Sequence, residues 1–409
     1  MTDSAAAAPE QLGADYYQHP LAYFARMRGE GPVTPVVLPG GSGRIWLVTR
    51  YADVRAALAD PRLHKDWAAK LTEPGWVPDE VTGYLAVHML NADPPGHTRL
   101  RKLVTKAFTA RRVAGLRPRV AAITASLLDA MAARADSGGG VVDLLDAFAF
   151  PLPVTVICEL LGIPVEDQAE FREWSNAMLA DVGEPGSFRA AGTAMFHYFT
   201  KLVADKRADP ADDLVSALAQ ASACAEPDGA LDERELIAML FLLLVAGHET
   251  TTNLIASGTL ALLTNPAELS RLRADPSLLP GATEELLRYA NPLNHATERF
   301  TLEPLEIGGV TIPAREWVLC VTSSANRDPA RFPDADRLDV GRDASGHVGF
   351  GHGIHYCLGA PLARLEGEVA FGALLSRFPS LSLAVDPATL RWRQSSLIHG
   401  LETLPVRLG

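Results

Sequence analysis

A single cysteine stands in a glycine-punctuated segment near the end of the chain. Residues 350–360 read Phe-Gly-His-Gly-Ile-His-Tyr-Cys-Leu-Gly-Ala, and a helical pattern begins at Pro361, just after Cys357. A cysteine at a helix N-terminus faces free amide N–H groups and the positive end of the dipole, which favour the thiolate. Thiolate is the form that binds a metal. Gly351 and Gly353 would let a bulky partner approach it closely.

Three roles for this cysteine are open on the residues alone. One thiolate with no second cysteine nearby suits the axial position of a haem iron. A zinc site would use Cys357 with His347, His352 and His355, but these lie in one short stretch with no distant pair to close a tetrahedron. A small buried hydrophobe is the third role. We favour the haem ligand.

A second motif lies inside an apolar helix predicted over residues 232–264. Asp232 and Glu235 form a capping-box-like pair at its start, and Asn265-Pro266 ends it. The motif reads Ala-Gly-His-Glu-Thr-Thr over residues 246–251. An acid and hydroxyls in such a helix are costly unless they have partners or a function. The small residues at 246 and 247 would leave a hollow with a hydroxyl at its rim; the alternative is a helix kink in which Thr250 bonds a carbonyl of the preceding turn.

Together these segments resemble the cytochrome P450 monooxygenases, from about Pro32 to the C-terminus. The resemblance implies that Cys357 is the axial ligand of haem b, that Thr250 stabilises activated oxygen, and that Glu249 belongs to the proton path. The other cofactor-binding positions it implies are His97, Arg101, Arg299 and His355 for the propionates, Phe350 and Gly359 around the sulfur, and Ala246 and Gly247 beside the oxygen site.

The family also has a structural network of an acid and two arginines. Glu285 and Arg288 are three residues apart, hence on one helix face, and Arg337 matches the third position. Without the resemblance, the first two would be an ordinary surface pair. Three positions depart from the family pattern, where relatives commonly have an acid, a glycine and a proline: Gly96, Arg315 and Ala335.

The reaction implied is insertion of one oxygen atom from O₂ into an unactivated C–H bond, giving a hydroxylated or epoxidised product. The substrate walls implied are mostly apolar, which suits a sizeable hydrophobic molecule such as a macrolide or other polyketide, a terpenoid or a steroid. The residues implied are Trp76, Leu85, Val87, His88, Met89, Met178, Leu179, Leu243, Leu293, Asn294, Ala296, Leu397 and Ile398, with His295 and His399 as further polar groups.

Electrons are expected from NAD(P)H through a reductase and a ferredoxin. Ferredoxins are acidic, so a basic docking patch is expected on this otherwise acidic chain. The candidates are Arg99, Lys102, Lys106, Arg111, Arg112 and Arg364. The rival functions are a haem-thiolate peroxygenase, isomerase or oxidative coupling enzyme, and a haem sensor without turnover. The acid and threonine of the central helix argue against both, because they serve proton delivery to oxygen.

The elements that position these residues predict a mainly α fold with small β-sheets, in which the haem lies between the central helix and the helix that follows Cys357. Helices are expected at Pro20–Arg28, at 51–60 and through most of 97–287, strands at 44–50, 305–312 and 317–322, and an irregular loop at about 67–90. No linker or repeat divides the chain, so one domain over 1–409 is expected, with 1–15 poorly ordered.

Composition narrows the class of protein. The 409 residues are 48% hydrophobic and carry a net charge of −12, which argues against nucleic acid as a partner. The longest apolar run, Met239 to Gly247, is about half the length that spans a bilayer. The N-terminus lacks a signal-peptide pattern, and the four cysteines at 158, 224, 320 and 357 form no disulfide framework. We expect a cytoplasmic monomer in the style of actinomycete enzymes.

Overall fold

The computed structural model describes residues 8–41, 43–66, 83, 85–137, 139–180, 186–222 and 230–409. They form two compact units, each built from separate stretches of the chain. The first unit comprises Met1–His64, Ala121–Ala149 and Thr250–Gly409, and the second comprises Lys65–Val120 and Phe150–Glu249. The boundary falls inside the long helix α12 (Glu233–Leu263). The expected single domain stays a prediction.

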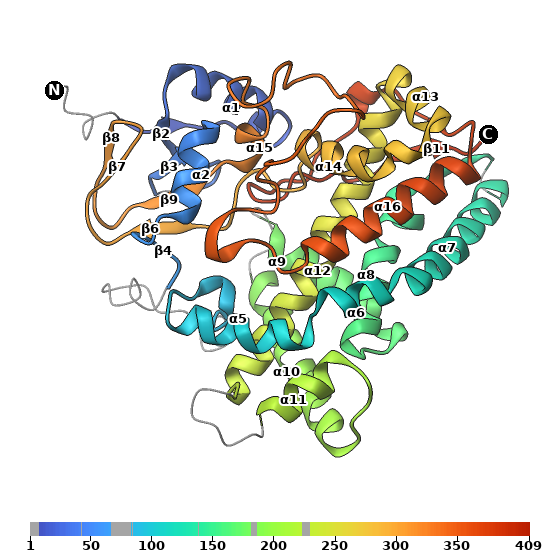
Figure 1. Ribbon diagram of the computed structural model, residues 1–409, viewed down its shortest axis with the longest axis horizontal. Helices are drawn as coiled ribbons and strands as arrows, with labels where there is room; N and C mark the ends of the chain where they lie inside the picture. Colours follow the sequence, from blue (N-terminus) through green and yellow to red (C-terminus); the bar gives the residue numbers. More distant parts are fainter. Residues whose placement is uncertain are drawn as a thin grey trace. The chain divides into compact units, whose positions relative to one another are not determined.

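The first unit contains the β-structure (Figure 1). Its main sheet has the strand order β1-β2-β3-β9-β6-β4. β3 pairs in parallel with β9, with Ile45 opposite Trp317, and antiparallel with β2. These strands are β1 (Glu10–Gln11), β2 (Val33–Val37), β3 (Ile45–Val48), β4 (Leu63–His64), β6 (Arg299–Thr301) and β9 (Trp317–Cys320). The smaller sheets are β10-β11-β5, from Ser382–Leu383, Pro405–Arg407 and Val141–Asp143, and the hairpin of β7 (Leu305–Ile307) and β8 (Val310–Ile312).

The segment expected to be poorly ordered, residues 1–15, is described from residue 8 onward, and the expectation itself stays a prediction. β1 pairs with β2, and a 3-10 turn at Ala14–Tyr17 follows it. Tyr16 and Tyr17 are buried in a core cluster with residues of β2 and β3.

Helices complete the first unit and pack against the segment that carries Cys357. Leu254 and Leu262 of α12, Leu286 of α14, and Phe371 of α16 belong to one core cluster, and Phe350 from the cysteine segment joins it. The helices of this unit are α1 (Pro20–Glu30), α2 (Tyr51–Ala59), most of α7 (Arg117–Ser137), the second part of α12, α13 (Pro266–Ala274), α14 (Leu279–Tyr289), α15 (Thr322–Ala325) and α16 (Ala360–Arg377).

The second unit is helical in its described residues. α9 packs on α10, α10 on α11, and α11 on α5. The helices are α5 (Gly96–Ala107), α6 (Ala110–Gly115), the start of α7, α8 (Pro151–Leu161), α9 (Gln168–Leu179), α10 (Ser187–Ala208), α11 (Leu214–Ser222) and α12 up to Glu249. The structure therefore matches the predicted class, mainly α with small sheets.

The central helix α12 begins and ends within a residue of the expected bounds. Its capping box is formed: the Glu235 N–H donates to Asp232 Oδ1 at 2.7 Å, and the Asp232 N–H donates to Glu235 Oε2 at 3.1 Å. By length and composition this helix could cross a membrane, but 72% of its most apolar window is buried inside the protein. Its apolar residues therefore belong to the protein core.

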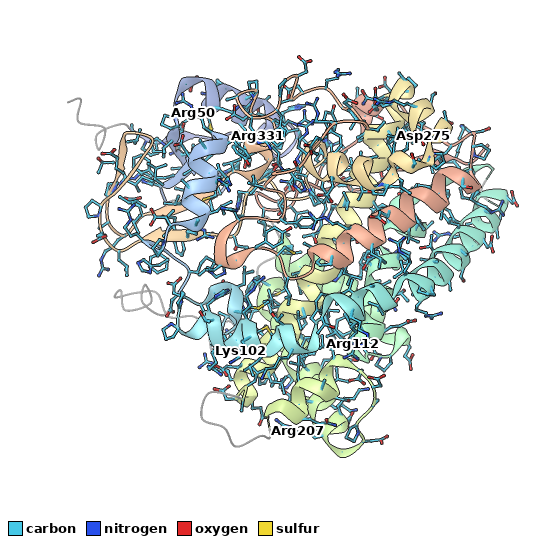
Figure 2. All side chains as sticks on the ribbon, viewed as in Figure 1. Arg50, Lys102, Arg112, Arg207, Asp275 and Arg331 are labelled. Carbon is cyan, nitrogen blue, oxygen red and sulfur yellow. The ribbon has the colours of Figure 1, made fainter. Side chains whose placement is uncertain are left out.

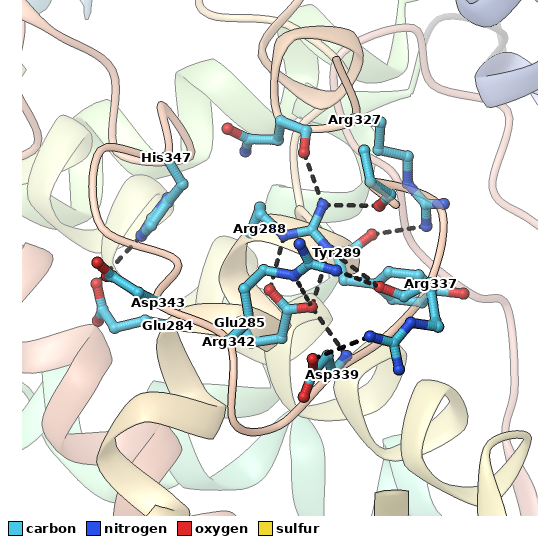
Figure 3. A network of polar contacts seen from close by, with 12 residues as sticks. Glu284, Glu285, Arg288, Tyr289, Arg327, Arg337, Asp339, Arg342, Asp343 and His347 are labelled. Carbon is cyan, nitrogen blue, oxygen red and sulfur yellow. Dashed lines mark hydrogen bonds and ion pairs between the residues drawn. The ribbon is translucent and has the colours of Figure 1, made fainter. Parts of the chain in front are cut away.

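The interior of the first unit holds an ion pair. Arg288 and Glu285 lie one turn apart on α14, and both side chains are fully buried. Arg288 Nε and Nη2 donate to the two Glu285 oxygens at 2.7 and 2.8 Å. The guanidinium also donates to the carbonyls of Asn326 and Ala335 at 2.8 Å and of Arg337 at 3.3 Å (Figure 3). These bonds satisfy charges that would otherwise be costly to bury.

The expected third member of this network is replaced by another arginine. The Arg337 side chain is 59% exposed and donates to Asp339 at 3.1 Å, so only the Arg337 carbonyl reaches the network. Arg342 instead places Nε 3.2 Å from Glu285 Oε1 and is 11% exposed. Both arginines lie in the same irregular connection, and the fold alone decides which of them turns inward.

We predict unequal effects from removing these two arginines. Arg342→Ala takes a charged donor from the buried Glu285 carboxylate and should lower the free energy of unfolding by about 2 kcal/mol. Arg337→Ala removes an exposed ion pair and should cost less than about 0.5 kcal/mol. Urea denaturation followed by circular dichroism measures both. Equal losses would show that Arg337 carries the network after all.

Candidate functional site

Cys357 lies at the end of a loop fixed by backbone hydrogen bonds. The Cys357 N–H donates to the Phe350 carbonyl at 2.9 Å, and a 3-10 turn, Gly353–His355, lies between them. Gly351 and Gly353 have φ of 74° and 75°, a region that favours glycine. The next helix, α16, begins at Ala360 with no acidic residue in its first turn. The thiol itself is exposed, whereas the other described cysteines are buried.

A charged cluster supports Phe350 from inside the first unit. Arg364 on α16 donates two hydrogen bonds to Glu284 on α14, at 2.6 and 2.9 Å, and its guanidinium carbon lies 4.6 Å from the Phe350 ring centroid. His347 Nε2 lies 3.2 Å from the same carboxylate. Burial alone would raise the pKa of Glu284, but the bonds from His347 and Arg364 lower it to about 2.

The zinc alternative does not fit these contacts. His347 uses Nε2 toward Glu284 and accepts from the Gly349 N–H at Nδ1, so neither nitrogen is left for a metal. Within the described ranges, no group of three or more His, Cys, Asp or Glu side chains gathers as a metal site. Among the described residues, the exposed Cys357 thiol has no group of other metal-binding side chains around it. A single thiol of this kind fits the axial position of a haem.

Two of the expected propionate-binding residues belong to the first unit. Arg299 lies on β6 and is buried, and its Nη1 donates to the Leu63 carbonyl at 3.5 Å. His355 ends the 3-10 turn two residues before Cys357 and is half-buried. A cation on the sheet and a histidine beside the thiolate are chemically suited to carboxylate groups.

The other two lie on α5 in the second unit. His97 and Arg101 are one turn apart, with His97 buried and Arg101 half-buried. Burial, and then the charge of Arg101, lower the pKa of His97 below its ordinary value. A neutral imidazole next to a guanidinium can still donate a hydrogen bond to a propionate. These four residues therefore have suitable chemistry for the cofactor's acid groups.

The residues expected to take part in oxygen activation lie at an uncovered point within the buried middle of the central helix. Ala246 is exposed, and Gly247 and Thr250 are half-buried, although the helix on both sides of them is buried. A Cβ on Gly247 would come within 2.9 Å of Ile157 on α8, so the close approach of the two helices needs glycine there. Glu249 is buried, with Oε1 3.6 Å from His248 Nε2. Ala246 and Gly247 have small side chains and are not fully covered, so a large planar cofactor could lie against the helix at this point.

The residues expected to line the substrate site differ in exposure. Val87, Met178, Leu179, Leu293, Ala296 and Leu397 are half-buried, whereas Leu85, Met89, Leu243 and Ile398 are buried. Trp76 lies outside the described residues, as does most of the expected 67–90 loop. His88 is buried and stacked on Phe241, with ring centroids 6.5 Å apart, and burial lowers its pKa to about 3. His88 is therefore a neutral group.

Asn294 does not offer its amide to a ligand, contrary to expectation. It is 2% exposed, and its Nδ2 donates to the Ser396 carbonyl at 3.0 Å while Oδ1 lies 3.2 Å from His399 Nδ1. Both ends of the side chain are thus engaged inside the protein.

The expected basic patch is reduced to three residues. Arg99 pairs with Glu235, and Arg364 pairs with Glu284, so neither charge is available to a partner. Arg112 lies 3.4 Å from Asp212. Lys102, Lys106 and Arg111 are exposed on α5 and α6, and no acid of the described chain lies within ion-pair distance of them. Figure 2 shows Lys102 on α5. The surrounding stretch 94–128 contains eight Lys and Arg and no acid, so the excess of positive charge is already present in the local sequence.

A further titratable group was not anticipated. Glu366 lies on α16 nine positions after the thiolate and is 1% exposed. Burial raises its pKa to about 8, so the side chain is protonated near neutral pH. The stretch Leu365 to Ala370 contains two acids, Glu366 and Glu368, and nothing in the sequence marks Glu366 as the buried one.

Three comparisons place the chain among known proteins. The family model for cytochrome P450 matches residues 186–389. The chain is 52% identical to Cytochrome P450 107B1 of Saccharopolyspora erythraea, covering 94% of both. It is 47% identical to 6-deoxyerythronolide B hydroxylase of the same organism, covering 94% of this chain and 95% of that one. The tirandamycin C-bound structure of the P450 monooxygenase TamI matches with a TM-score of 0.90 at 48% identity, covering 98% of this chain and all of that one.

The buried Glu366 predicts a pH dependence of stability. The fold keeps the proton that the unfolded chain releases above about pH 4.5, so this contribution is full below that pH and is lost as pH rises through about 8. Between about pH 4.5 and pH 8, Glu366 should lower the free energy of unfolding of the wild type by up to about 1.4 kcal/mol for each pH unit. Glu366→Gln should remove that slope in denaturant titrations, whereas Glu368→Gln, on the same helix, should keep it. An unchanged slope in Glu366→Gln would contradict the assignment.

Proposed function

The chain belongs to the cytochrome P450 family, and we propose that this monooxygenase hydroxylates or epoxidises a sizeable hydrophobic molecule with Cys357 as the axial ligand of haem b. The observation that carries the proposal is the exposed Cys357 thiol at the end of a hydrogen-bonded loop before α16. The loop holds the sulfur in place, and exposure leaves it accessible to the iron. The bound haem would supply oxygen activation.

The chain's own residues divide the remaining tasks. Thr250 would hold a proton at its hydroxyl beside the small residues Ala246 and Gly247, and Glu249 would move protons toward it from the buried side of the helix. Arg299, His355, His97 and Arg101 would hold the propionates. Phe350, packed in the core beneath the loop, would keep water away from the sulfur.

The substrate class follows from the apolar side chains. Six half-buried apolar residues stand at the positions expected for the substrate walls, while Asn294 has its amide engaged and His88 is neutral. A site with few polar groups favours a large apolar ligand. The names of two relatives agree with this class, since one hydroxylates 6-deoxyerythronolide B and the other was solved with tirandamycin C. A polyketide or macrolide is our preferred substrate, ahead of a terpenoid or steroid.

Electrons would arrive singly from NAD(P)H through a reductase and an acidic ferredoxin. Lys102, Lys106 and Arg111 support this proposal, because they are exposed cations with no acidic partner in the described chain. Such charges raise the association rate of an oppositely charged protein. We further propose that the enzyme acts as a cytoplasmic monomer. A haem-thiolate peroxygenase, one rival activity, would take its oxidising equivalents from peroxide and would not depend on this electron supply.

The ligand assignment predicts a spectral change. The reduced, carbon-monoxide-bound protein should show a strongly red-shifted Soret band, because a thiolate donates more electron density than an imidazole. Cys357→His should lose that band. Cys158→Ala is the matched control and should keep it, since Cys158 is buried and its burial raises the pKa of the thiol to about 12. A wild-type band at the imidazole position would refute the proposed ligand.

The docking proposal predicts slower electron transfer when the patch is reversed. Changing Lys102, Lys106 and Arg111 together to Glu should slow the reduction of the enzyme by a [2Fe–2S] ferredoxin about tenfold at low salt. Added salt should make the rates of the wild type and the variant more alike, because it screens the charges. Stopped-flow absorbance measures the rate. Arg119→Glu is the control: Arg119 is exposed, but Glu159 already pairs with it at 2.8 Å, so a smaller effect is expected. Equal slowing by both variants would contradict a localised docking patch.

A further inference from the structure

All four polar groups of Asn294 are engaged, three of them with one loop. The Asn294 N–H donates to the Leu397 carbonyl at 2.8 Å, Nδ2 donates to the Ser396 carbonyl at 3.0 Å, and Oδ1 lies 3.2 Å from His399 Nδ1. The His399 N–H donates back to the Pro292 carbonyl at 2.8 Å, and Leu293 pairs with Ile398 as an antiparallel bridge. Two segments about a hundred residues apart are thus tied together.

The two sides of this connection differ in what supports them. Segment 292–294 rests on α15, because the Asn294 carbonyl accepts from the N–H of Ser323 at 3.2 Å and from its hydroxyl at 2.8 Å. The loop is the tip of a hairpin over residues 391–402, whose stem is closed by the Trp392–Leu401 bridge. Asn294 therefore joins the hairpin tip to segment 292–294 within the first unit, and its side chain supplies two of the bonds.

The chemistry of the pair fixes the orientation of both side chains. The Ser396 carbonyl can only accept, so Nδ2 of Asn294 must face it and Oδ1 must face His399. Burial, and then the charge of Arg327, lower the pKa of His399 to about 4, so its ring is neutral near pH 7. The neutral ring therefore donates from Nδ1 to Asn294 Oδ1.

The 391–402 hairpin lies beside α12, the helix that carries Thr250. A Cβ on Gly400 would come within 2.0 Å of Asn253 Oδ1, so the hairpin packs directly against α12 at that position. Asn253 is three residues after Thr250, on the same face of the helix. Leu293 and Leu397, on the two tied segments, are half-buried, so part of their apolar surface is uncovered.

We propose that Asn294 is a specificity-determining positioning residue, which locks the 391–402 hairpin to segment 292–294 and so holds Leu293 and Leu397 as one preformed apolar wall. The inference rests on the proposed function, because it assigns these leucines to the substrate side of a haem-thiolate enzyme. A preformed wall binds a bulky ligand without first having to be ordered. A loosened wall loses that advantage, and a ligand too small to reach it is unaffected.

The test uses the haem-loaded protein and two azoles that bind haem iron, imidazole and the much bulkier clotrimazole. Asn294→Asp keeps the acceptor for His399 but puts an oxygen against the Ser396 carbonyl; Asn294→Ala removes both bonds. We expect the Kd of clotrimazole, from spectral titration, to rise about three- to tenfold in both variants, with the Kd of imidazole unchanged. Hydrogen exchange at the His399 amide should quicken by about tenfold, the factor for roughly 1.4 kcal/mol of lost hydrogen bonding.

Gln18→Ala is the matched control. Gln18 also makes two hydrogen bonds to the hairpin, with the Trp392 carbonyl at 2.8 Å and its N–H at 3.1 Å, but at the stem. It should leave the ratio of the two azole Kd values as in the wild type. An unchanged ratio in both Asn294 variants, or equal weakening of both azoles, overturns the positioning role. A wild-type protein without the red-shifted carbon monoxide band overturns the proposed function instead, so the two failures are distinguishable.

Discussion

The buried ion pair between Glu285 and Arg288 is the constraint on which the first unit depends. Two full charges with no solvent exposure are tolerable only if nearly every donor and acceptor around them is matched. Carbonyls of three residues between 326 and 337 accept from the guanidinium, and Arg342 shares the carboxylate. The conformation of residues 326–342 is therefore restricted, because a different path would leave a buried charge without its hydrogen-bond partners.

The path of residues 326–342 determines where the segment that carries Cys357 begins. The Asn326 carbonyl accepts from Arg288, and its side-chain Oδ1 accepts from the Val348 N–H at 2.7 Å. Val348 is buried in the sheet core, and Phe350 in the helical core, so two apolar anchors precede the loop that exposes Cys357. The sulfur is held by a chain of contacts that starts at the ion pair. A side chain placed in this way does not have to be ordered when a ligand binds.

Arginine and lysine serve different purposes in this protein. Arg288, Arg342 and the partly exposed Arg364 each make several directed hydrogen bonds, which suits the planar guanidinium. Lys102 and Lys106 stand exposed on α5, where a hydrated point charge on a flexible stem is sufficient for attraction at a distance. This division lets an acidic chain keep a local basic surface without losing arginines from its core.

The sequence by itself determined the chemistry and the longest helix. The motifs around Cys357 and Thr250 are local, and α12 carries its own start and stop signals in the capping box and Pro266, so its bounds were predicted to within a residue. Only the tertiary structure decided which polar side chains are already engaged. It selected Arg342 over Arg337, engaged Asn294 with His399, and buried Glu366. The physical reason is that each of these depends on a partner or neighbour far away in the chain, and a hydrogen bond at 3 Å leaves no trace in residue spacing.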